Sequence, residues 1–242
     1  MADCGELLIV IPARGGSKRL PRKNVLPLAG KPLICWTIES ALQTGLKARI
    51  LVTSDDEEIL SIASRYADQG VIAHKRPAAL ATDTATTADV LVEAAESEQK
   101  AGHTPDTLVL LQPTSPLRTA TDILDAVDTF QEAGCKDTVV SVCEVDHPTA
   151  WIGVIDERAM FSGIDLSGKR SQDYQREYRL NGGVYVARVD VLRSRHSLFT
   201  ESLRASVMPR ARSFDIDEEI DFRVCESLLS PLSVARNKSL NN

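Results

Sequence analysis

The sequence has few cysteines, and they follow no metal-binding or disulfide pattern. Five occur among 242 residues, an odd number, and none belongs to a CxxC pair. Such a set predicts neither a disulfide framework nor a zinc site, so most of these thiols are expected to be small apolar groups in the core. The five are Cys4, Cys35, Cys135, Cys143 and Cys225.

Long apolar runs are also missing. No stretch approaches the roughly 18 apolar residues of a membrane-spanning helix, so no membrane partner is expected. Residues 1–6 are polar and the apolar run at 7–11 is short, which does not fit a secretory signal. These features predict a cytoplasmic protein. A chain of this length has room for one substantial α/β domain with its own core.

Positive charge is in deficit overall but concentrated in one place. The formal net charge is −6, which argues against a nucleic-acid partner. A cluster of basic residues within ten positions suits a small polyanion better than a duplex, which would need a broad basic face. The cluster consists of Arg14, Lys18, Arg19, Arg22 and Lys23.

The segment that carries this cluster has further features of a phosphate-binding loop. Gly15 and Gly16 allow the backbone to approach a ligand closely, and Ser17 can donate a hydrogen bond. A solvated basic loop is the alternative interpretation. The glycines, the preceding strand and the acidic background favour phosphate binding. Neither the GxxxxGK[ST] nor the GxGxxG motif is present.

Short apolar runs alternate with amphipathic segments through the first two-thirds of the chain. This rhythm predicts an α/β fold, a mostly parallel twisted sheet flanked by helices. Ligands of such sheets bind at the carboxyl ends of the strands, which directs attention to 12–24, 54–56 and 112–118. Strands are expected at 7–11, 49–53, 71–73, 107–111 and 138–142, with helices at 32–44, from a cap at Asp55 or Asp56 to 68, at 86–101 and from a cap at Thr121.

The rhythm changes after His147. Residues from about 147 to 180 are polar and weakly periodic, and they are too many for a structureless loop, so a protruding arm that meets a partner subunit is predicted. Strands at 182–187 and 214–216 and a helix at 218–229 follow. We therefore expect a single domain over 1–230 that includes the arm, and a flexible tail at 231–242.

Five segments, in order, resemble the acylneuraminate cytidylyltransferases, also called CMP-sialic acid synthetases. The family pattern IPARxxSKxLPxKN matches the first, and the resemblance extends from about residue 6 to 230. It implies a Rossmann-like nucleotide-diphospho-sugar transferase fold and the transfer of CMP from CTP to a nonulosonic acid. The segments are IPARGGSKRLPRKN (11–24), RP with LATDTATT (76–77 and 80–87), LQPTSPLRT (111–119), NGGVY (181–185) and DID (215–217).

The resemblance implies roles for residues around CTP. Three are expected near the cytosine: Arg76, Ala85 and Thr87. Another set would hold the phosphates and ribose: Arg14, Ser17, Lys18, Lys23 and Asn24. The catalytic group would be Arg14, Lys18, Lys23 and Asp217. The three cations, with a metal ion held by Asp217, would neutralise the triphosphate, and no covalent enzyme intermediate is expected. No general base is identified.

The resemblance also implies an acceptor side built from Gln112, Arg118, Arg179 and Asn181. An amide can read hydroxyl groups, and a guanidinium can bind a carboxylate through two parallel hydrogen bonds. An arm from a second subunit would complete this side in a homodimer. Here Ser171 and Tyr174-Gln175 depart from the family pattern. The acceptor is therefore expected to be N-acetylneuraminate or a legionaminate-type relative, without a choice between them.

Asp215 and Asp217 are the metal candidates. Residues two apart in an extended strand face the same side, so both carboxylates could reach one Mg²⁺, or alternatively Mn²⁺. The competing interpretation is that Asp217, followed by Glu218 and Glu219, caps the next helix.

Two other functions remain open at this point. One is a cytidylyltransferase for a 3-deoxy-octulosonate-type sugar, although the Ser17-Lys18 pair disfavours it. The other is a non-catalytic nucleotide-sugar-binding protein on the same scaffold. Retention of the basic loop and of both aspartates disfavours that alternative.

Overall fold

The computed structural model describes residues 2–17, 19–82 and 84–230. Lys18 and the predicted flexible tail at 231–242 lie outside the described residues.

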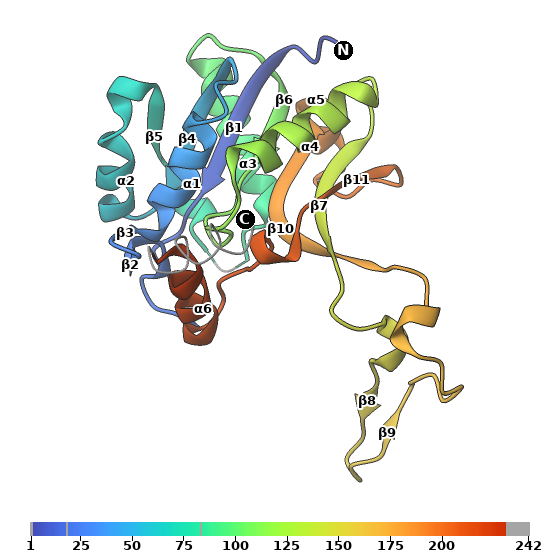
Figure 1. Ribbon diagram of the computed structural model, residues 1–242. Coiled ribbons are helices and arrows are strands. Elements are labelled where there is room, and N and C mark those ends of the chain that lie inside the picture. The colour runs from blue at the N-terminus through green and yellow to red at the C-terminus, as the bar shows by residue number, and fades with distance from the viewer. Residues whose placement is uncertain (1, 18, 83, 231–242) are drawn as a thin grey trace, which may run out of the picture.

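A twisted sheet forms the centre of the molecule (Figure 1). In the described part of the chain it has seven strands in the order β11-β7-β10-β6-β1-β4-β5. All neighbours pair in parallel except β10, which is antiparallel to both β6 and β7. The predicted mostly parallel sheet is confirmed. The strands are β1 (Glu6–Pro12), β4 (Ala48–Ser54), β5 (Val71–Lys75), β6 (Pro105–Leu110), β7 (Thr138–Glu144), β10 (Tyr178–Arg188) and β11 (Leu203–Val207).

Helices cover both faces of this sheet. Ile9 and Ile11 of β1 lie in one apolar cluster with residues of α1, α2 and α4, while Leu8 and Val10 lie in a second with residues of α3 and α5. Burial on both faces explains why the strands appear in the sequence as continuous apolar runs. The helices are α1 (Leu33–Leu42), α2 (Glu57–Ser64), α3 (Thr87–Lys100), α4 (Ala120–Glu132), α5 (Val189–Arg195) and α6 (Glu219–Leu229).

Helix starts follow their capping side chains. Asp56 caps α2 by accepting bonds from the backbone N–H groups of Glu58 and Ile59 at 3.0 and 3.1 Å. The predicted cap of α4, Thr121, is wrong. Thr119 is the cap, because its hydroxyl and N–H both bond the carboxylate of Asp122 three residues later, at 2.8 Å each.

The predicted strand at 214–216 is not present. The N–H of Ile216 donates to the carbonyl of Thr114 at 2.8 Å, but residues 214–216 pair with no strand of the sheet. Phe214 and Ile216 nevertheless both pack in one apolar cluster to which Asp215 does not belong, so the side chains alternate as an extended segment requires.

Helix α5, the edge strand β11 and two small hairpins were not predicted from the sequence, whereas a protruding segment was. Helix α5 and the edge strand β11 have short or mixed patterns that carry little periodic signal. Residues between β7 and β10 protrude from the body of the molecule, as Figure 1 shows, and contain the short hairpin β8 (Val154–Ile155) and β9 (Phe161–Ser162). A second small hairpin, β2 (Pro27–Leu28) with β3 (Lys31–Pro32), precedes α1.

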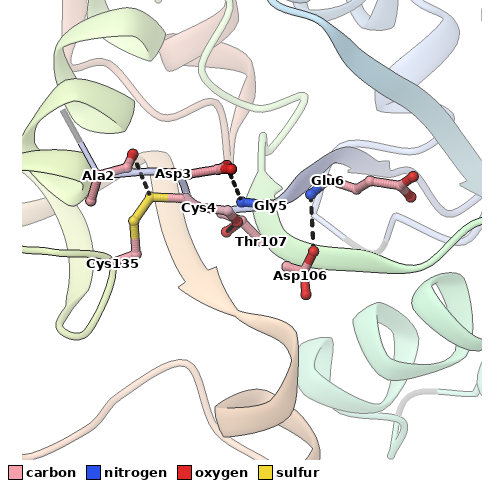
Figure 2. Close-up of a disulfide and its surroundings, with 8 residues drawn as sticks. All are labelled: Ala2, Asp3, Cys4, Gly5, Glu6, Asp106, Thr107 and Cys135. Carbon is pink, nitrogen blue, oxygen red and sulfur yellow. Dashed lines mark hydrogen bonds between the residues drawn. A yellow bond between two sulfur atoms is a disulfide. The ribbon is translucent and has the colours of Figure 1, made fainter.

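A disulfide corrects the prediction drawn from the cysteine pattern. Cys4, just before β1, is bonded to Cys135, just after α4, although 131 positions separate them (Figure 2). The prediction fails because spacing along the chain says nothing about which thiols the fold brings together. Cys35, Cys143 and Cys225 are free and buried, as expected.

The helices of the described ranges include none that is both long and apolar enough to cross a membrane.

Candidate functional site

A cavity of about 670 Å³ opens where the loops that follow β1, β5 and β6 meet. This is the sheet edge that the strand–helix rhythm predicted. Most of the predicted site residues line it. They are Arg14, Ser17, Lys23, Asn24, Arg76, Ala85, Thr87, Gln112, Asp215 and Asp217.

The loop after β1 supplies the basic wall of the cavity. Asn24 closes this loop, since its Nδ2 donates to the carbonyl of Arg14 at 3.0 Å. The Oδ1 atom of Asn24 is buried and has no hydrogen-bond partner in the described residues. The 3₁₀ turn η1 (Lys23–Val25) buries Lys23, whose ammonium group donates to the carbonyl of Ile216.

Arg76 and the start of α3 form another part of the cavity lining. Arg76 is buried, and its Nη2 donates to the carbonyl of Thr53 at 2.9 Å. Burial lowers the pKa of Arg76, and the negative charges of Asp55 and Glu93 oppose that shift. Thr86 caps α3 through a capping box with Asp89. Both Thr86 and Thr87, the first residue of α3, line the cavity, so the amino end of this helix lies there. A helix amino end favours electron-rich ligand atoms.

Two carboxylates form the acidic side. Burial raises the pKa of Asp215, and the nearby Asp217 and Asp221 raise it further, while a hydrogen bond with Thr114 and the charge of Lys23 oppose the shift. Asp217 is paired with Lys23 at 3.5 Å and with Arg19 at 3.0 Å. Carboxylates that repel one another in this way create a place for a cation.

Asp217 does not cap the following helix. Glu218 is the cap residue of α6, and the carboxylate of Asp221 accepts bonds from the N–H groups of Asp217 and Glu218 at 3.0 and 2.8 Å. The competing interpretation of Asp217 is therefore wrong, and its side chain faces the cavity.

The carboxylate pair fits a hard divalent cation. No group of three or more histidine, cysteine, aspartate or glutamate side chains that could hold a metal occurs among the described residues. Oxygen donors from two carboxylates, with the remaining positions left to water and phosphate, are the environment that Mg²⁺ usually has in proteins.

The residues predicted for the acceptor side are not all at the cavity. Gln112 lines it, whereas Arg118 and Asn181 are each 3% exposed and lie outside its lining. Arg179 is exposed near the start of β10, at the base of the arm. The acceptor-side residues of this chain are thus separated in the structure.

Arg19 and Thr114 are two of the cavity residues that were not predicted from the sequence. Arg19 belongs to the basic cluster and pairs with Asp217. Thr114 bonds Asp215 and accepts the N–H of Ile216 through its carbonyl. The only signal for Thr114 was its position inside the LQPTSPLRT segment, four residues after the end of β6.

Comparison with known proteins identifies the family and the fold. Residues 8–179 match the protein family described as cytidylyltransferase. The N-acylneuraminate cytidylyltransferase of Escherichia coli O18:K1:H7 is 35% identical over 90% of this chain, and the match spans 51% of that relative. The chain thus spans about half the length of that protein.

Other similarities extend over whole chains. The CMP-N,N'-diacetyllegionaminic acid synthase of Legionella pneumophila is 34% identical over 93% of this chain and 96% of its own length. The structure of a CMP:2-keto-3-deoxy-manno-octonic acid synthetase in complex with CTP has the same fold, with a TM-score of 0.70 at 22% identity over 93% of this chain and 98% of that one. The chain belongs to the cytidylyltransferase family.

Proposed function

We propose that this protein transfers CMP from CTP to a nonulosonic acid, such as N-acetylneuraminate or a legionaminate-type sugar, and releases pyrophosphate. One observation carries the proposal. A single cavity at the carboxyl ends of the strands combines a basic glycine-containing loop, a buried arginine beside a helix amino end, and a carboxylate pair. Each of these suits one part of a metal-bound nucleoside triphosphate.

The reaction is a direct displacement at phosphorus. The anomeric hydroxyl oxygen of the sugar acid bonds to the α-phosphorus, the bond from that phosphorus to the bridging oxygen breaks, and pyrophosphate leaves. The hydroxyl proton passes to a base that is not assigned to a residue. Arg14, Lys23 and Ser17 would bind and orient the triphosphate, which is the main source of catalysis in such transfers. Lys18 is proposed to assist them.

Asp215 and Asp217 would hold Mg²⁺, which when bound supplies positive charge against the triphosphate. Lys23 would add positive charge of its own, because it lines the cavity. It is buried, bonds the carbonyl of Ile216 and lies 3.5 Å from the carboxylate of Asp217. It fixes the backbone between the two aspartates. Arg76, Ala85 and Thr87 would surround the cytosine.

The choice of a nonulosonic acid rests on the relatives. One is named for N-acylneuraminate and another for diacetyllegionaminic acid, and both are more similar in sequence than the octonic acid synthetase that shares the fold. Gln112 is the residue on the cavity wall that would read the acceptor hydroxyls.

The test is pyrophosphate release with CTP and Mg²⁺ and a panel of acceptors. The panel contains N-acetylneuraminic, legionaminic, pseudaminic and octulosonic acids. We expect release with at least one of the nine-carbon acids and much slower release with the octulosonic acid. Release only with the octulosonic acid would replace the proposed acceptor class. Binding of CTP without release for any acceptor would favour a non-catalytic nucleotide-sugar-binding protein.

A homodimer formed through the arm belongs to the same proposal. The arm, residues 147–180, exposes large apolar side chains that no other part of the described chain covers, among them Ile152, Val154, Ile155 and Phe161. Such a patch is typical of a protein interface. Arg179, at the arm's base, would then contribute to the acceptor side of the neighbouring subunit.

Cytoplasmic location is the last part of the proposal. Disulfides are rare in the reducing cytoplasm, so the Cys4–Cys135 pair would be held there as two thiols. Alkylation of thiols in freshly lysed cells, followed by mass spectrometry, measures the fraction of the pair that is bonded. A fully bonded pair in such cells would contradict a cytoplasmic location.

A further inference from the structure

Two residues assigned to the acceptor by sequence resemblance lie behind the cavity wall. We propose that Arg118 and Asn181 are positioning residues, which hold Gln112 and the segment bearing Asp215 and Asp217 at a fixed separation through their shared contact with Gly183. The inference rests on the proposed function for the identity of the reaction. It assigns no sugar contact to either residue.

Arg118 joins three segments of the fold. Its Nη1 donates to the carbonyls of Gln112 and Gly183 at 3.1 and 2.8 Å, and its Nη2 donates to the hydroxyl of Thr37 in α1 at 2.8 Å. Its Nε is buried without a partner among the described residues. A guanidinium in this position cannot reach a molecule in the cavity, but it fixes the backbone from which the Gln112 side chain projects.

Asn181 has no hydrogen-bonding capacity left for a ligand. Its Oδ1 accepts from the hydroxyl of Ser141 at 2.6 Å and from the N–H of Gly183 at 3.1 Å. Its Nδ2 donates to the hydroxyl of Ser213 at 2.8 Å and to the sulfur of Met208 at 3.3 Å. Those contacts use both donors and both acceptor positions of the amide. Ser213 lies two residues before Asp215.

Gly183 is the point where the two positioning residues meet. Its N–H bonds Asn181 and its carbonyl bonds Arg118. A Cβ atom there would lie 2.9 Å from the sulfur of Met208 and 3.2 Å from the hydroxyl of Ser141, so the position has no room for a side chain. The pairing of β10 with β7 is interrupted here, between Leu180 and Tyr185, which leaves these backbone groups available for side-chain partners.

The loop that bears Gln112 and the segment that bears the two aspartates are also joined directly at the cavity. The carbonyl of Thr114, on the same loop as Gln112, accepts the N–H of Ile216 between the two aspartates at 2.8 Å. A shift of either the loop or the aspartate segment therefore changes the distance between Gln112 and the two carboxylates. Because displacement of a reacting group by about 1 Å can cost about 100-fold in rate, the network controls turnover without touching a substrate.

The first experiment cuts the link between Asn181 and the aspartate segment without changing Asn181. Ser213→Ala removes the hydroxyl that Nδ2 bonds, and Ser213 does not line the cavity. We expect kcat to fall about 10- to 100-fold, as is common when a supporting contact is lost. The amides of 213–218 should exchange with deuterium faster than in the unchanged protein. Asn181→Ala should reproduce both effects, and the double variant should be no worse than Asn181→Ala alone.

The second experiment cuts the link between Arg118 and α1. Thr37→Val keeps the shape of a fully buried side chain but removes the acceptor of Nη2. We expect faster exchange of the amides in 111–118 and a lower kcat. Ser206→Ala is the matched control, because Ser206 is a buried serine on β11 outside this network. It should leave exchange at both segments unchanged.

The opposite outcome would overturn the inference. If Arg118 and Asn181 contact the sugar, Ser213→Ala and Thr37→Val should match the unchanged protein, while Asn181→Ala should raise the KM for the sugar alone. Exchange measurements need no turnover. If the proposed function is wrong, the protein without any substitution will release no pyrophosphate. If this inference is wrong, the variants will show unaltered amide exchange at 111–118 and 213–218.

Discussion

The ionised side chain of Asp215 lowers the stability of the folded chain, although it lies in the candidate site. Burial and two neighbouring carboxylates raise its pKa, so its charged form is disfavoured in the folded chain. A cation bound beside it would reverse that balance. If Asp215 holds Mg²⁺ as proposed, stability and function make opposite demands on this one side chain.

Asp215→Asn is expected to lower kcat by about 100-fold or more, because it removes charge from the proposed Mg²⁺ site. Steady-state pyrophosphate release at saturating CTP and Mg²⁺ measures this. Glu201→Gln is the control, because Glu201 is an exposed carboxylate that does not line the cavity, and this substitution should leave kcat unchanged. Turnover by Asp215→Asn equal to that of the control would remove the metal role.

The same variant is expected to raise the melting temperature at neutral pH in the absence of metal. Because the folded state raises the pKa of Asp215, its ionised form costs folding free energy above that pKa. Below the ordinary aspartate pKa both folded and unfolded chains hold the proton, so the difference between the variant and the unchanged protein should disappear. Thermal unfolding at pH 7 and at low pH checks both halves.

Gly182 controls the placement of Gln112. Its φ is +73°, and a Cβ atom there would lie 2.7 Å from Oε1 of Gln112. Gly182→Ala should therefore displace the Gln112 side chain and raise the KM for the sugar acid several-fold more than the KM for CTP. Gly70→Ala is a suitable comparison, since Gly70 lies outside the arm and also has a positive φ, but no atom near the added carbon. Equal effects of the two substitutions would indicate backbone strain alone.

Sequence motifs located the neighbourhood of the site better than the role of each residue in it. Gln112 and Arg118 belong to one segment, yet one lines the cavity and the other lies behind it. The turn between them, in which the N–H groups of Ser115 and Arg118 bond the carbonyls of Gln112 and Ser115, decides this. Such a turn sets side-chain direction through geometry that residue types alone do not specify.

At the scale of elements, the amino end of α4 depends on a carboxylate with several partners. Asp122 is 2% exposed, bonds the N–H and hydroxyl of Thr119, and is bidentate with Arg212 at 2.9 and 2.8 Å. Burial raises the pKa of Asp122, but the bonds from Arg212 and Thr119 outweigh burial and lower it overall. Asp122 thus ties α4 to the segment that precedes the aspartate pair.

Asp122→Asn is expected to cost about 1–3 kcal/mol of unfolding free energy at pH 7, a range that allows for partial exposure of Arg212. Since folding lowers the pKa of Asp122, its contribution is present above the ordinary aspartate pKa and is lost as the pH falls through the lower folded value. Urea unfolding at pH 7 and near pH 3 measures the change. A cost that does not shrink in acid would exclude the charged pair as its source.

Elements with a strong pattern were predictable, and those stabilised by their surroundings were not. β1, β4 and β6 are buried on both faces, so their apolar runs are unambiguous. β11 exposes Leu203 and Val207 and is held by pairing with β7 at the sheet edge. Residues 214–216 alternate like a strand but pair with no strand; the N–H of Ile216 bonds the carbonyl of Thr114 in a loop instead.

At the scale of the whole molecule, the arm leaves large apolar side chains exposed to water. Ile155 is 71% exposed and Leu166 is 85% exposed. Apolar surface of this kind is energetically unfavourable in water, and a second subunit would remove it.

Ile155→Arg is expected to convert a dimer to monomers and to raise the KM for the sugar acid at least several-fold, with little change in the KM for CTP. Sedimentation velocity at micromolar concentration gives the assembly state. Val207→Arg adds the same charge at an exposed apolar residue on β11 and should leave the assembly intact. A monomeric, fully active unchanged protein would contradict the dimer.

The register at the base of the arm has an evolutionary consequence. Tyr178 of β10 pairs with Glu144 of β7, so the chain leaves and re-enters the sheet at opposed residues of one strand pair. The intervening segment can be lengthened, shortened or exchanged without shifting any other strand. If the arm completes the acceptor side and the loops after β1, β5 and β6 bind the nucleotide, as proposed, recognition of the acceptor can diversify by replacement of this one segment while the nucleotide site stays the same.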